Sequence, residues 1–469
     1  MNILLINPSQ YKIYGSAMSP DYPPLGLGYL GAILEKEGHK VKVLDIDAEN
    51  ISKGDLITLL KNFNPLLVGI TCTTPTYKNA VELGALIKNI IPTKIVLGGI
   101  HPTIDPENAI KAKSIDMLII GEGEKTIKEL AEFIEKNETD FSKINGLVYK
   151  KENKIIINNP REMIQNLDEL PFPARHLFGS RKYTYPDALY EQSFPIFTSR
   201  GCPGQCTYCC SKQIFCGKFR YRSAKNIVDE IEYLIKKYGA KEIHMWDDCF
   251  TLIKNRVFEV RNEFIKRKIK IKVAFPNGLR VDMVDPEILK ALKEMGTYSI
   301  AFGVESGNQD ILNKIKKGTK IEQIIKAFKE TKKLGIEIWG FFMIGLPGET
   351  KETIMDTINF AIKLNPDIAK FHILKPYPGS EAYHDLLKQN LIMDYDYSNY
   401  GIHIGPVHRL PTVSKKEMMA YQKLAYRKFY LRPSILLKQL KRIKSWNRFK
   451  LNMAAGLSVF GMMFKKEDL

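Results

Sequence analysis

The sequence predicts an α/β protein with an N-terminal doubly wound parallel sheet, then a partial (β/α)6 barrel, and finally a helical C-terminal tail. Two alternating patterns and one charge imbalance carry this prediction. Short β-branched runs alternate with helical patterns over residues 1–140, and the alternation returns over residues 186–400. Basic residues gather after residue 400. We therefore expect two α/β domains, joined by a linker at residues 141–185 and followed by an extension at residues 401–469.

Five apolar runs in the first domain predict strands, and four stretches between them predict helices. The strands are Asn2–Asn7, Lys40–Asp45, Leu66–Cys72, Lys94–Leu97 and Asp116–Ile120. The helices are Leu25–Glu37, Asp55–Phe63, Tyr77–Ile90 and Glu124–Ile134. Continuous apolar strands separated by helices indicate a parallel sheet covered on both faces. The right-handed crossover rule then gives a doubly wound, flavodoxin-like sheet.

Threonines, glycines and one glutamate lie at the ends of three of these strands, at the edge where such sheets bind ligands. They are Thr71, Thr73, Thr74, Gly98, Gly99, Gly121 and Glu122. The first strand is not followed by G-x-G-x-x-G, which disfavours a dinucleotide and favours a large, flat ligand over the strand ends. The alternative is a set of ordinary strand-to-helix turns with N-caps.

The linker is predicted to contain a hairpin and to end at a proline-rich boundary. Gly146–Asn158 has two apolar runs with polar residues between them, and Pro171–Ala174 resists continuation of helix or strand.

The second domain is predicted to contain six strand–helix units. The strands are Phe194–Ser199, Lys241–Trp246, Lys270–Phe275, Tyr298–Gly303, Ile336–Ile344 and Asp367–Ile373. The helices are Ala224–Tyr238, Asn255–Lys268, Pro286–Met295, Ile321–Leu334 and Glu352–Leu364. This pattern suits an open, partial barrel with its site at the C-terminal strand ends, although a second doubly wound sheet would share the periodicity.

Three Cys with the spacing C-x3-C-x2-C follow the first of these strands. Cys202, Cys206 and Cys209 lie within eight residues interrupted by Gly and Pro, so they can wrap one metal centre. Three ligands leave one iron of a four-iron cluster uncovered, as catalysis needs. The alternative is a structural zinc or Fe–S site completed by Cys210, Cys216 or Cys249.

This loop, with Tyr208 before its third Cys, resembles the signature of the radical S-adenosylmethionine (SAM) enzymes. The resemblance implies that Cys202, Cys206 and Cys209 hold a [4Fe-4S] cluster. It also implies that SAM binds the exposed iron and yields a 5′-deoxyadenosyl radical after one-electron reduction. A reductase or flavodoxin-type protein would then supply the electron.

Polar groups at the other strand ends look like the positions where this superfamily holds SAM. Asp247 would lie near the methionyl ammonium, and Arg280 would pair with the carboxylate. Glu305 and Ser306 would reach the ribose or the amino-acid part, and the backbone around Ile344–Gly345 would flank the adenine. For each residue alone, a helix cap or a surface ion pair is the alternative.

A doubly wound domain placed before such a barrel resembles the cobalamin-binding radical SAM family. Pro23–Gly26, the Thr-rich turn and the Gly98–Gly99 turn match that family, and the resemblance covers roughly residues 1–400. There is no D-x-H-x-x-G after the first strand, and His101 follows the fourth strand. We therefore expect the lower face of cobalt to lack a His from this chain.

The net charge of +18 lies mostly in the tail. Between Met418 and Lys466 there are twelve Lys or Arg and no Asp or Glu, which leaves +6 for the rest of the chain. A nearly balanced body argues against a nucleic-acid partner.

Composition sets further limits, because 44% hydrophobic and 26% charged residues exclude disorder and collagen. Seven Cys are too few for a disulfide-dense scaffold. The N-terminus has no charged residues before its apolar run and so does not resemble a signal peptide. We therefore expect a cytoplasmic protein.

The tail is predicted to form two helices and a short apolar segment. A capping box at Ser414–Glu417 begins the first helix, which ends near Leu431 before Pro433, and Ser434 caps the second. Leu451–Phe464 is uncharged but too short to span a bilayer. A basic amphipathic helix before it suggests peripheral membrane contact, while the alternative is a helical cap packed on the barrel.

Three functions follow from the resemblance. The first is methylation of an unactivated carbon in a small-molecule or lipid-like substrate. The second is a cyclase or oxidoreductase that uses the same cofactors without methyl transfer. The third is a tRNA methylthiotransferase, which the single N-terminal Cys72 and the charge distribution disfavour. Cys210, Cys216 and Cys249 stay unassigned, although Cys210 is expected to point away from the cluster and Cys249 to fill buried space.

Overall fold

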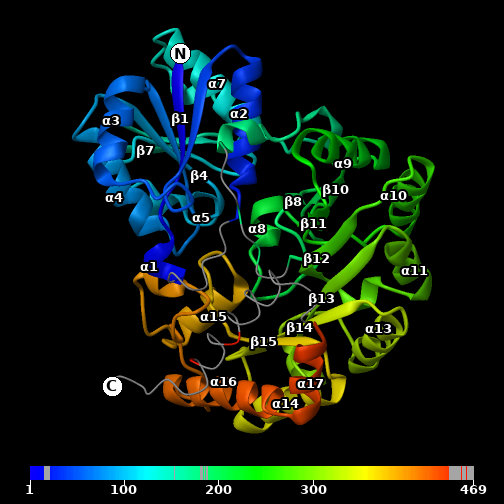
Figure 1. The fold of residues 1–469 in the computed structure, drawn as a ribbon. Coiled ribbons are helices and arrows are strands. Elements are labelled where there is room, and N and C mark those ends of the chain that lie inside the picture. The colour runs from blue at the N-terminus through cyan, green and yellow to red at the C-terminus, as the bar shows by residue number, and fades with distance from the viewer. Residues whose placement is uncertain are drawn as a thin grey trace. The chain divides into compact units, whose positions relative to one another are not determined.

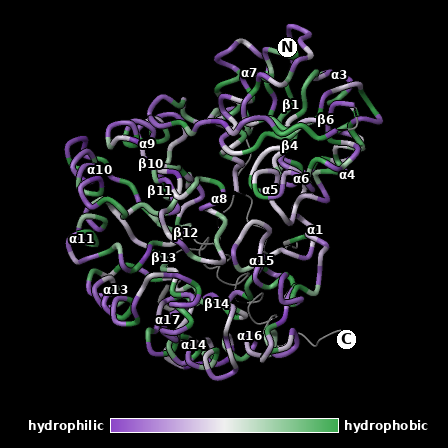
Figure 2. Tube along the Cα trace, turned by 180° about the vertical axis from the view of Figure 1, so that it is seen from behind, coloured by the Kyte–Doolittle hydropathy of each residue, from purple (hydrophilic) through white to green (hydrophobic). Residues whose placement is uncertain are grey.

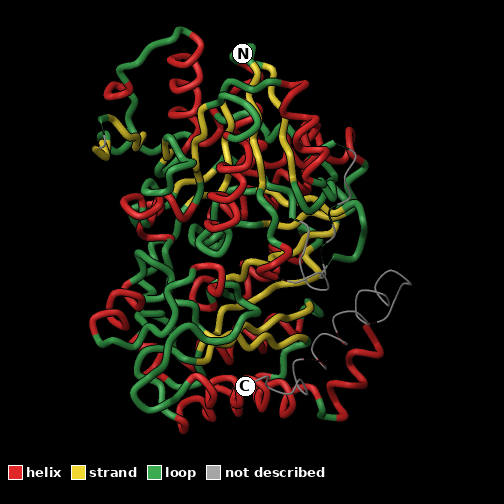
Figure 3. The backbone as a smooth tube through the Cα atoms, turned by 90° about the vertical axis from the view of Figure 1, so that its left-hand side faces the viewer, coloured by secondary structure: helices red, strands yellow, loops and turns green. Residues whose placement is uncertain are grey.

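The computed structural model describes residues 1–14, 22–152, 154–179, 183, 185, 188–442, 456 and 461 (Figure 1). The chain divides into two units. The N-terminal unit contains Met1–Thr184, Gln213–Phe215 and Asp396–Ile404. The barrel unit contains Tyr185–Lys212, Cys216–Tyr395 and Gly405–Leu469. Each unit has its own sheet, and Figure 3 shows the strands of each sheet lying side by side among helices.

The N-terminal sheet confirms the predicted doubly wound topology. Its strands are β1 (Asn2–Asn7), β2 (Lys40–Asp45), β3 (Leu67–Thr71), β4 (Lys94–Gly98), β5 (Met117–Ile119), β6 (Leu147–Lys151) and β7 (Lys154–Ile157). The order is β2-β1-β3-β4-β5-β6-β7, with β1 to β5 parallel. The strands are hydrophobic in Figure 2, and Leu4 and Ile6 are fully buried, as expected for a sheet covered on both faces.

The hairpin predicted at Gly146–Asn158 is part of this sheet. β6 pairs antiparallel with β5, and β7 pairs antiparallel with β6. The hairpin therefore extends the doubly wound sheet by two antiparallel strands rather than standing apart from it as a connector.

In the described part of residues 1–179, the four predicted helices are present together with three short helices that were not predicted. They are α1 (Tyr11–Tyr14), α2 (Leu25–Lys36), α3 (Lys53–Phe63), α4 (Tyr77–Lys88), α5 (Ile100–Ile104), α6 (Pro106–Ala109) and α7 (Gly123–Glu135), with the 3-10 turns η1 (Phe141–Lys143), η2 (Leu167–Glu169) and η3 (Arg175–Phe178). A capping box of Ser52 and Asp55 starts α3, two residues before the predicted start.

The barrel unit contains an open sheet of six parallel strands, as predicted. Its strands are β8 (Ser193–Ile196), β11 (Glu242–Met245), β12 (Lys272–Leu279), β13 (Thr297–Glu305), β14 (Glu337–Ile344) and β15 (Ile368–Ile373), in the order β15-β14-β13-β12-β11-β8. β9 (Ser199–Arg200), which follows β8 along the chain, forms a short antiparallel pair with β10 (Arg220–Tyr221). β12 continues beyond the predicted strand to Leu279, and β13 continues to Glu305, with register shifts in the pairing of both strands.

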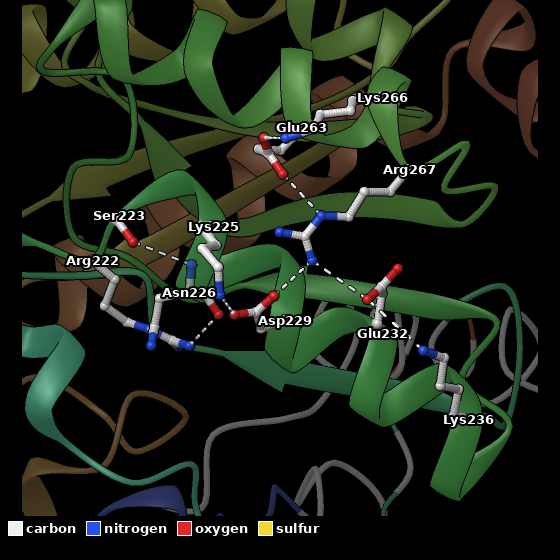
Figure 4. Close-up of polar contacts among 10 residues, drawn as sticks. All are labelled: Arg222, Ser223, Lys225, Asn226, Asp229, Glu232, Lys236, Glu263, Lys266 and Arg267. Atoms are coloured by element: carbon white, nitrogen blue, oxygen red, sulfur yellow. Dashed lines mark hydrogen bonds and ion pairs between the residues drawn. The ribbon is translucent and has the colours of Figure 1, made fainter.

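Helices and 3-10 turns follow these strands along the chain, and the last of them, at Tyr397–Tyr400, belongs to the N-terminal unit. They are α8 (Ser211–Phe215), α9 (Ala224–Tyr238), α10 (Lys254–Lys266), η4 (Val281–Met283), α11 (Pro286–Glu294), α12 (Gln309–Lys314), α13 (Ile321–Lys333), α14 (Lys351–Leu364), α15 (Glu381–Lys388) and η5 (Tyr397–Tyr400). In β14, buried and partly exposed residues alternate, because one face packs on helices and the other faces the barrel interior. Arg267 joins α10 to α9 by ion pairs to Asp229 and Glu232 (Figure 4).

The first tail helix packs on the barrel. α16 (Lys415–Tyr430) begins at the predicted Ser414–Glu417 capping box and buries Met418 and Phe429 against β15 and α14. α17 (Pro433–Arg442) begins at Pro433, so Ser434 lies inside the helix and does not cap it. The apolar segment Leu451–Phe464 lies largely outside the described residues. Among the helices that the structure describes, none is long and apolar enough to cross a membrane.

Candidate active site

The three-Cys loop follows β9 in the barrel unit and is pinned at its middle. The amide of Thr207 donates to the Ile315 carbonyl at 3.0 Å, and the amide of Ala382 donates to the Thr207 carbonyl at 2.8 Å. Cys202 and Cys206 are half-buried and Cys209 is exposed. The loop is therefore held rigidly by α12 and α15 while its sulfurs stay accessible.

Hydrogen-bond donors point at each of the three sulfurs. The amide of Gly204 donates to Cys202 Sγ at 3.4 Å, and the amide of Ser211 donates to Cys209 Sγ at 3.4 Å. Arg280 Nη1 donates to Cys206 Sγ at 3.8 Å. Donors of this kind stabilise thiolates, which are the form of Cys that binds metal.

Cys202 has the environment of a thiolate ligand. The thiol of Cys249, the amide of Gly204 and the charge of Arg280 together lower the pKa of Cys202 to about 6, although burial opposes them. In the described part of the chain, no three His, Cys, Asp or Glu side chains converge to hold one ion. A four-iron cluster takes each Cys on a different iron, so its ligands need not converge. The donor set thus fits a [4Fe-4S] cluster.

The other three Cys of the barrel unit have different surroundings. Cys210 donates to the Pro378 carbonyl at 3.6 Å, which directs its thiol away from the three sulfurs. Cys249 is 1% exposed and lies 3.2 Å from Met283 Sδ, and it also contacts Cys202. Cys249 is therefore buried filler that also touches a proposed cluster ligand. Cys216 is exposed and ends α8 in a left-handed conformation.

Asp247 is placed inside the protein rather than toward a ligand. Its side chain is 1% exposed, and Oδ1 accepts from the amides of Thr198 and Ser199 at 2.6 and 3.2 Å. Oδ2 accepts from both hydroxyls and lies 3.6 Å from Arg256 Nη2. These partners occupy both oxygens, so Asp247 anchors the chain entering the Cys loop and does not fit the ammonium contact that the sequence suggested.

Asp248 is the better candidate for that contact. It is exposed, and it accepts a hydrogen bond at 3.2 Å from the hydroxyl of Ser211, two residues after Cys209. Strand alternation could have identified it, because Ile243 and Met245 pack under the helices and Asp247 continues their face. Asp248 then falls on the open side of the strand end.

Arg280 lies beside the Cys loop with one end of its guanidinium held. Nε and Nη2 donate to Asp282 at 3.2 and 2.9 Å, and Nη2 also donates to the Lys317 carbonyl at 2.7 Å. Nη1 is the remaining end and faces Cys206. A planar guanidinium fixed in this way is suited to pair with a carboxylate beside the cluster.

Glu305 belongs to a buried group of three polar side chains. Lys317 Nζ donates to Glu305 Oε1 at 2.8 Å, and Tyr208 OH donates to the same oxygen at 3.2 Å. Glu305 has φ +63, and a Cβ at Gly303 would lie 2.6 Å from its Oε1. The Glu305 carboxylate thus folds back against Gly303, and a side chain at position 303 would displace it.

Ser306 is directed away from the barrel interior. It is fully buried, and its hydroxyl bonds Thr357 Oγ1 of α14 at 3.1 Å and accepts from the amide of Asn308 at 3.2 Å. Val304 precedes it on the same helix-covered face. Ser306 thus fixes the turn after β13 and does not present its hydroxyl to a ligand.

The backbone at Ile344–Gly345 is fully used by the protein. The Ile344 carbonyl accepts from Leu374, and the Gly345 amide donates to Glu349 Oε2 at 2.7 Å. His408 Nε2 donates to the Gly345 carbonyl at 2.8 Å. These contacts fix the shape of the turn, so that an adenine beside it would rest on the surface of the turn rather than on free backbone groups.

The predicted turns of the N-terminal unit present open glycines and one exposed hydroxyl. A Cβ at Gly98 or Gly121 would meet no heavy atom within 4 Å, and Thr73 is exposed beside them. Gly99 has φ +103, and a Cβ there would lie 2.9 Å from the Cys72 carbonyl. Space above the strand ends with a tightly folded backbone below fits a large flat group such as cobalamin.

The remaining predicted residues of these turns have internal partners. Thr71 Oγ1 would lie 3.2 Å from a Cβ at Gly99, so it stands at the same turn. Thr74 is buried, and its hydroxyl bonds His101 Nδ1 at 3.3 Å. Glu122 Oε2 accepts from the amide of Ile164 at 2.8 Å, which ties the linker to the turn. Thr74 and Glu122 therefore shape the edge of the sheet from behind.

Models of two known protein families match this chain, one in each unit. A model of the radical SAM superfamily matches residues 196–361, and a model of the B12 binding domain matches residues 11–131. The chain is 36% identical to the uncharacterised methyltransferase PH0819 of Pyrococcus horikoshii, over 94% of this chain and 95% of that protein. It is 27% identical to the anaerobic magnesium-protoporphyrin IX monomethyl ester cyclase of Rubrivivax gelatinosus, over 100% of this chain and 84% of that protein.

A solved structure shares the fold. The structure of the radical SAM methyltransferase TsrM from Kitasatospora setae, with cobalamin and a [4Fe-4S] cluster bound, has a TM-score of 0.75 and 18% identity. The match covers 97% of this chain and 99% of that chain.

Proposed function

The chain belongs to the radical SAM superfamily, in the group with an N-terminal B12-binding domain, and on this premise we propose that it methylates an unactivated carbon of a small-molecule or lipid-like substrate. It is an enzyme that uses a [4Fe-4S] cluster, SAM and cobalamin. When bound, these groups supply hydrogen-atom abstraction and a transferable methyl group.

The observation that carries the proposal is the arrangement around the Cys loop. We assign Cys202, Cys206 and Cys209 to the cluster, because they lie within one loop and each sulfur accepts a hydrogen bond, even though burial raises the pKa of the Cys209 thiol to about 11. Arg280 and Asp248 flank the same loop with opposite charges. They are suited to bind the carboxylate and the ammonium of the methionyl group and so to orient SAM.

The other predicted residues have smaller or indirect roles in binding SAM and cobalamin in this proposal. Glu305 is held at Oε1 by Tyr208 and Lys317, so its other carboxylate oxygen would reach the ribose or the amino-acid part of SAM. Asp247 and Ser306 hold strand ends in place, and Gly345 offers a surface for the adenine. In the N-terminal unit, we assign Thr73, Gly98 and Gly121 to direct contact with cobalamin, over the turn that Thr71, Thr74, Gly99 and Glu122 shape.

Product analysis tests methylation against the second candidate. Full-length protein, reconstituted anaerobically with iron, sulfide and hydroxocobalamin, is incubated with SAM and a reductant. S-adenosylhomocysteine formed together with 5′-deoxyadenosine supports methylation. 5′-Deoxyadenosine alone supports the cyclase or oxidoreductase, which the likeness to the Rubrivivax gelatinosus cyclase favours.

Membrane contact through the tail is a further part of the proposal. Lys438 of α17 pairs with Asp367 at 3.4 Å, and Ile435 is fully buried, while Leu437 is 61% exposed. The described part of α17 therefore packs on the barrel with one apolar residue free. Flotation of the full chain with anionic vesicles, but not of a chain ending at Tyr430, would support contact with a lipid surface, and equal flotation of both would exclude it.

A further inference from the structure

A segment from the C-terminal part of the chain belongs to the N-terminal unit. We call Asp396–Ile404 the returning segment, because it follows the barrel in sequence yet clusters with the first unit. Lys78 of α4 pairs with Asp396 at 3.3 Å. Tyr400 of η5 is fully buried, and a Cβ at Gly401 would lie 2.7 Å from Ile13 Cγ2. These contacts make the returning segment part of the core of the N-terminal unit.

Tyr397 of this segment contacts the turn that follows β4. Its hydroxyl donates to Asp105 Oδ2 at 3.0 Å, and its ring lies 5.0 Å from the His101 ring at an interplanar angle of 70°. Tyr77 of α4 contacts His101 as well, with ring centroids 4.6 Å apart. His101 is thus enclosed between two tyrosines that come from distant parts of the sequence.

His101 in turn supports the Thr-rich turn proposed to contact cobalamin. It is 0% exposed, its amide donates to the Cys72 carbonyl at 3.2 Å, and its Nδ1 bonds Thr74 Oγ1 at 3.3 Å. Its Nε2 has no hydrogen-bond partner among the described residues. Burial lowers the pKa of His101 to about 4, so the ring is neutral at pH 7 and is held mainly by packing.

The same turn carries the exposed Thr73. The Thr73 amide donates to Thr76 Oγ1 at 2.8 Å, and the two hydroxyls lie 3.0 Å apart. Thr74 connects this turn to His101, and Tyr397 closes the other side of His101. A buried imidazole with few hydrogen bonds depends on its ring contacts for its position, so displacement of Tyr397 would shift the turn.

We propose that Tyr397 is a positioning residue of the cobalamin site, which it serves by holding His101 beneath the Thr71–Thr76 turn. This inference rests on the proposed function of the N-terminal unit. It means that the cobalamin site is completed by the returning segment, and that a cofactor-binding surface built from residues 1–140 requires chain from beyond the barrel.

Cobalamin binding by full-length variants tests the proposal. Hydroxocobalamin is titrated into the wild type, Tyr397→Ala, Tyr397→Phe and the control Tyr395→Ala, whose side chain is 61% exposed. The absorbance spectrum of retained cobalamin gives the Kd. Tyr397→Ala is expected to weaken binding by about tenfold, because it removes one aromatic contact and one hydrogen bond. Tyr397→Phe retains the ring and is expected to recover most of this loss, while Tyr395→Ala binds as the wild type does.

Iron content and reductive SAM cleavage without cobalamin report separately on the barrel unit. Weaker cobalamin binding by Tyr397→Ala with both of these unchanged supports the proposal. Equal Kd values for wild type and Tyr397→Ala overturn it, and so does parallel loss of cobalamin, iron and SAM cleavage, which would mean general unfolding. Should Tyr397→Ala fail to fold, Tyr397→Leu decides, since it removes the aromatic ring that contacts His101 but keeps an apolar side chain, and binding equal to the wild type would contradict the proposal. Failure of the wild type itself to bind hydroxocobalamin would refute the proposed function instead.

Discussion

Removing the charge of Asp247 is predicted to lower stability and iron loading, whereas removing the charge of the adjacent Asp248 is predicted to weaken SAM binding. Asp247 is buried and bonded to Thr198 and Ser199, beside the buried Arg256. Asp248 is exposed and accepts a hydrogen bond from the hydroxyl of Ser211. The neutral variants Asp247→Asn and Asp248→Asn therefore separate support of the Cys loop from contact with SAM.

The expected magnitudes follow from the contacts that each variant removes. Asp247→Asn keeps the shape of the side chain but leaves Arg256 without its carboxylate and changes the bonds to both hydroxyls. Such a loss costs about 2–3 kcal/mol, and complete removal in Asp247→Ala costs about 3–5 kcal/mol. Asp248→Asn alters one exposed hydrogen bond and is expected to change the free energy of unfolding by less than about 0.5 kcal/mol.

Urea unfolding of the iron-free full chain measures the loss of stability in Asp247→Asn, and iron content after anaerobic reconstitution measures the consequence for the Cys loop. The SAM affinity of the reconstituted protein measures the effect of Asp248→Asn. We expect Asp247→Asn to be less stable and to load less iron, and Asp248→Asn to load iron normally but to bind SAM about tenfold more weakly. The reasoning is refuted if Asp247→Asn has wild-type stability and iron content but loses SAM, while Asp248→Asn binds SAM normally.

Three further predictions concern other parts of the two sites. Cys206→Ala is expected to abolish iron loading and SAM cleavage, as measured by iron analysis and 5′-deoxyadenosine, and full loading would contradict the cluster assignment. Burial raises the pKa of Glu349 to about 8. Because the unfolded state releases this proton near pH 4.5 and the folded state only near pH 8, stability should fall as pH rises through this window, by up to about 1.4 kcal/mol per pH unit. Glu349→Gln, whose amide oxygen can still accept from Gly345 and Leu346, should lack this slope in urea unfolding at pH 5 and 8. Electron paramagnetic resonance of bound Co(II) should show no nitrogen coupling from a protein His, and coupling that disappears in His101→Asn would overturn that expectation.

Strand alternation explains why some site residues were predictable and others were misplaced. Ile243 and Met245 lie on the helix-covered face, and Asp247 continues that face. Val304 and Ser306 repeat the relation at the end of β13. Their place after a strand predicts contact with a ligand for both Asp247 and Ser306, yet their position in the strand alternation directs both side chains under the helices.

The sequence by itself determined the two sheets, the order of their elements and the Cys loop, because these depend on residues that are neighbours in the chain. Hydrophobic period identifies strands and helices locally, and the three sulfurs lie within one short loop. Only the tertiary structure decided which carboxylate is open and which is enclosed. It also brought Tyr397 to Asp105, 292 residues away in sequence. Such contacts arise from how folded elements pack, and no local periodicity encodes them.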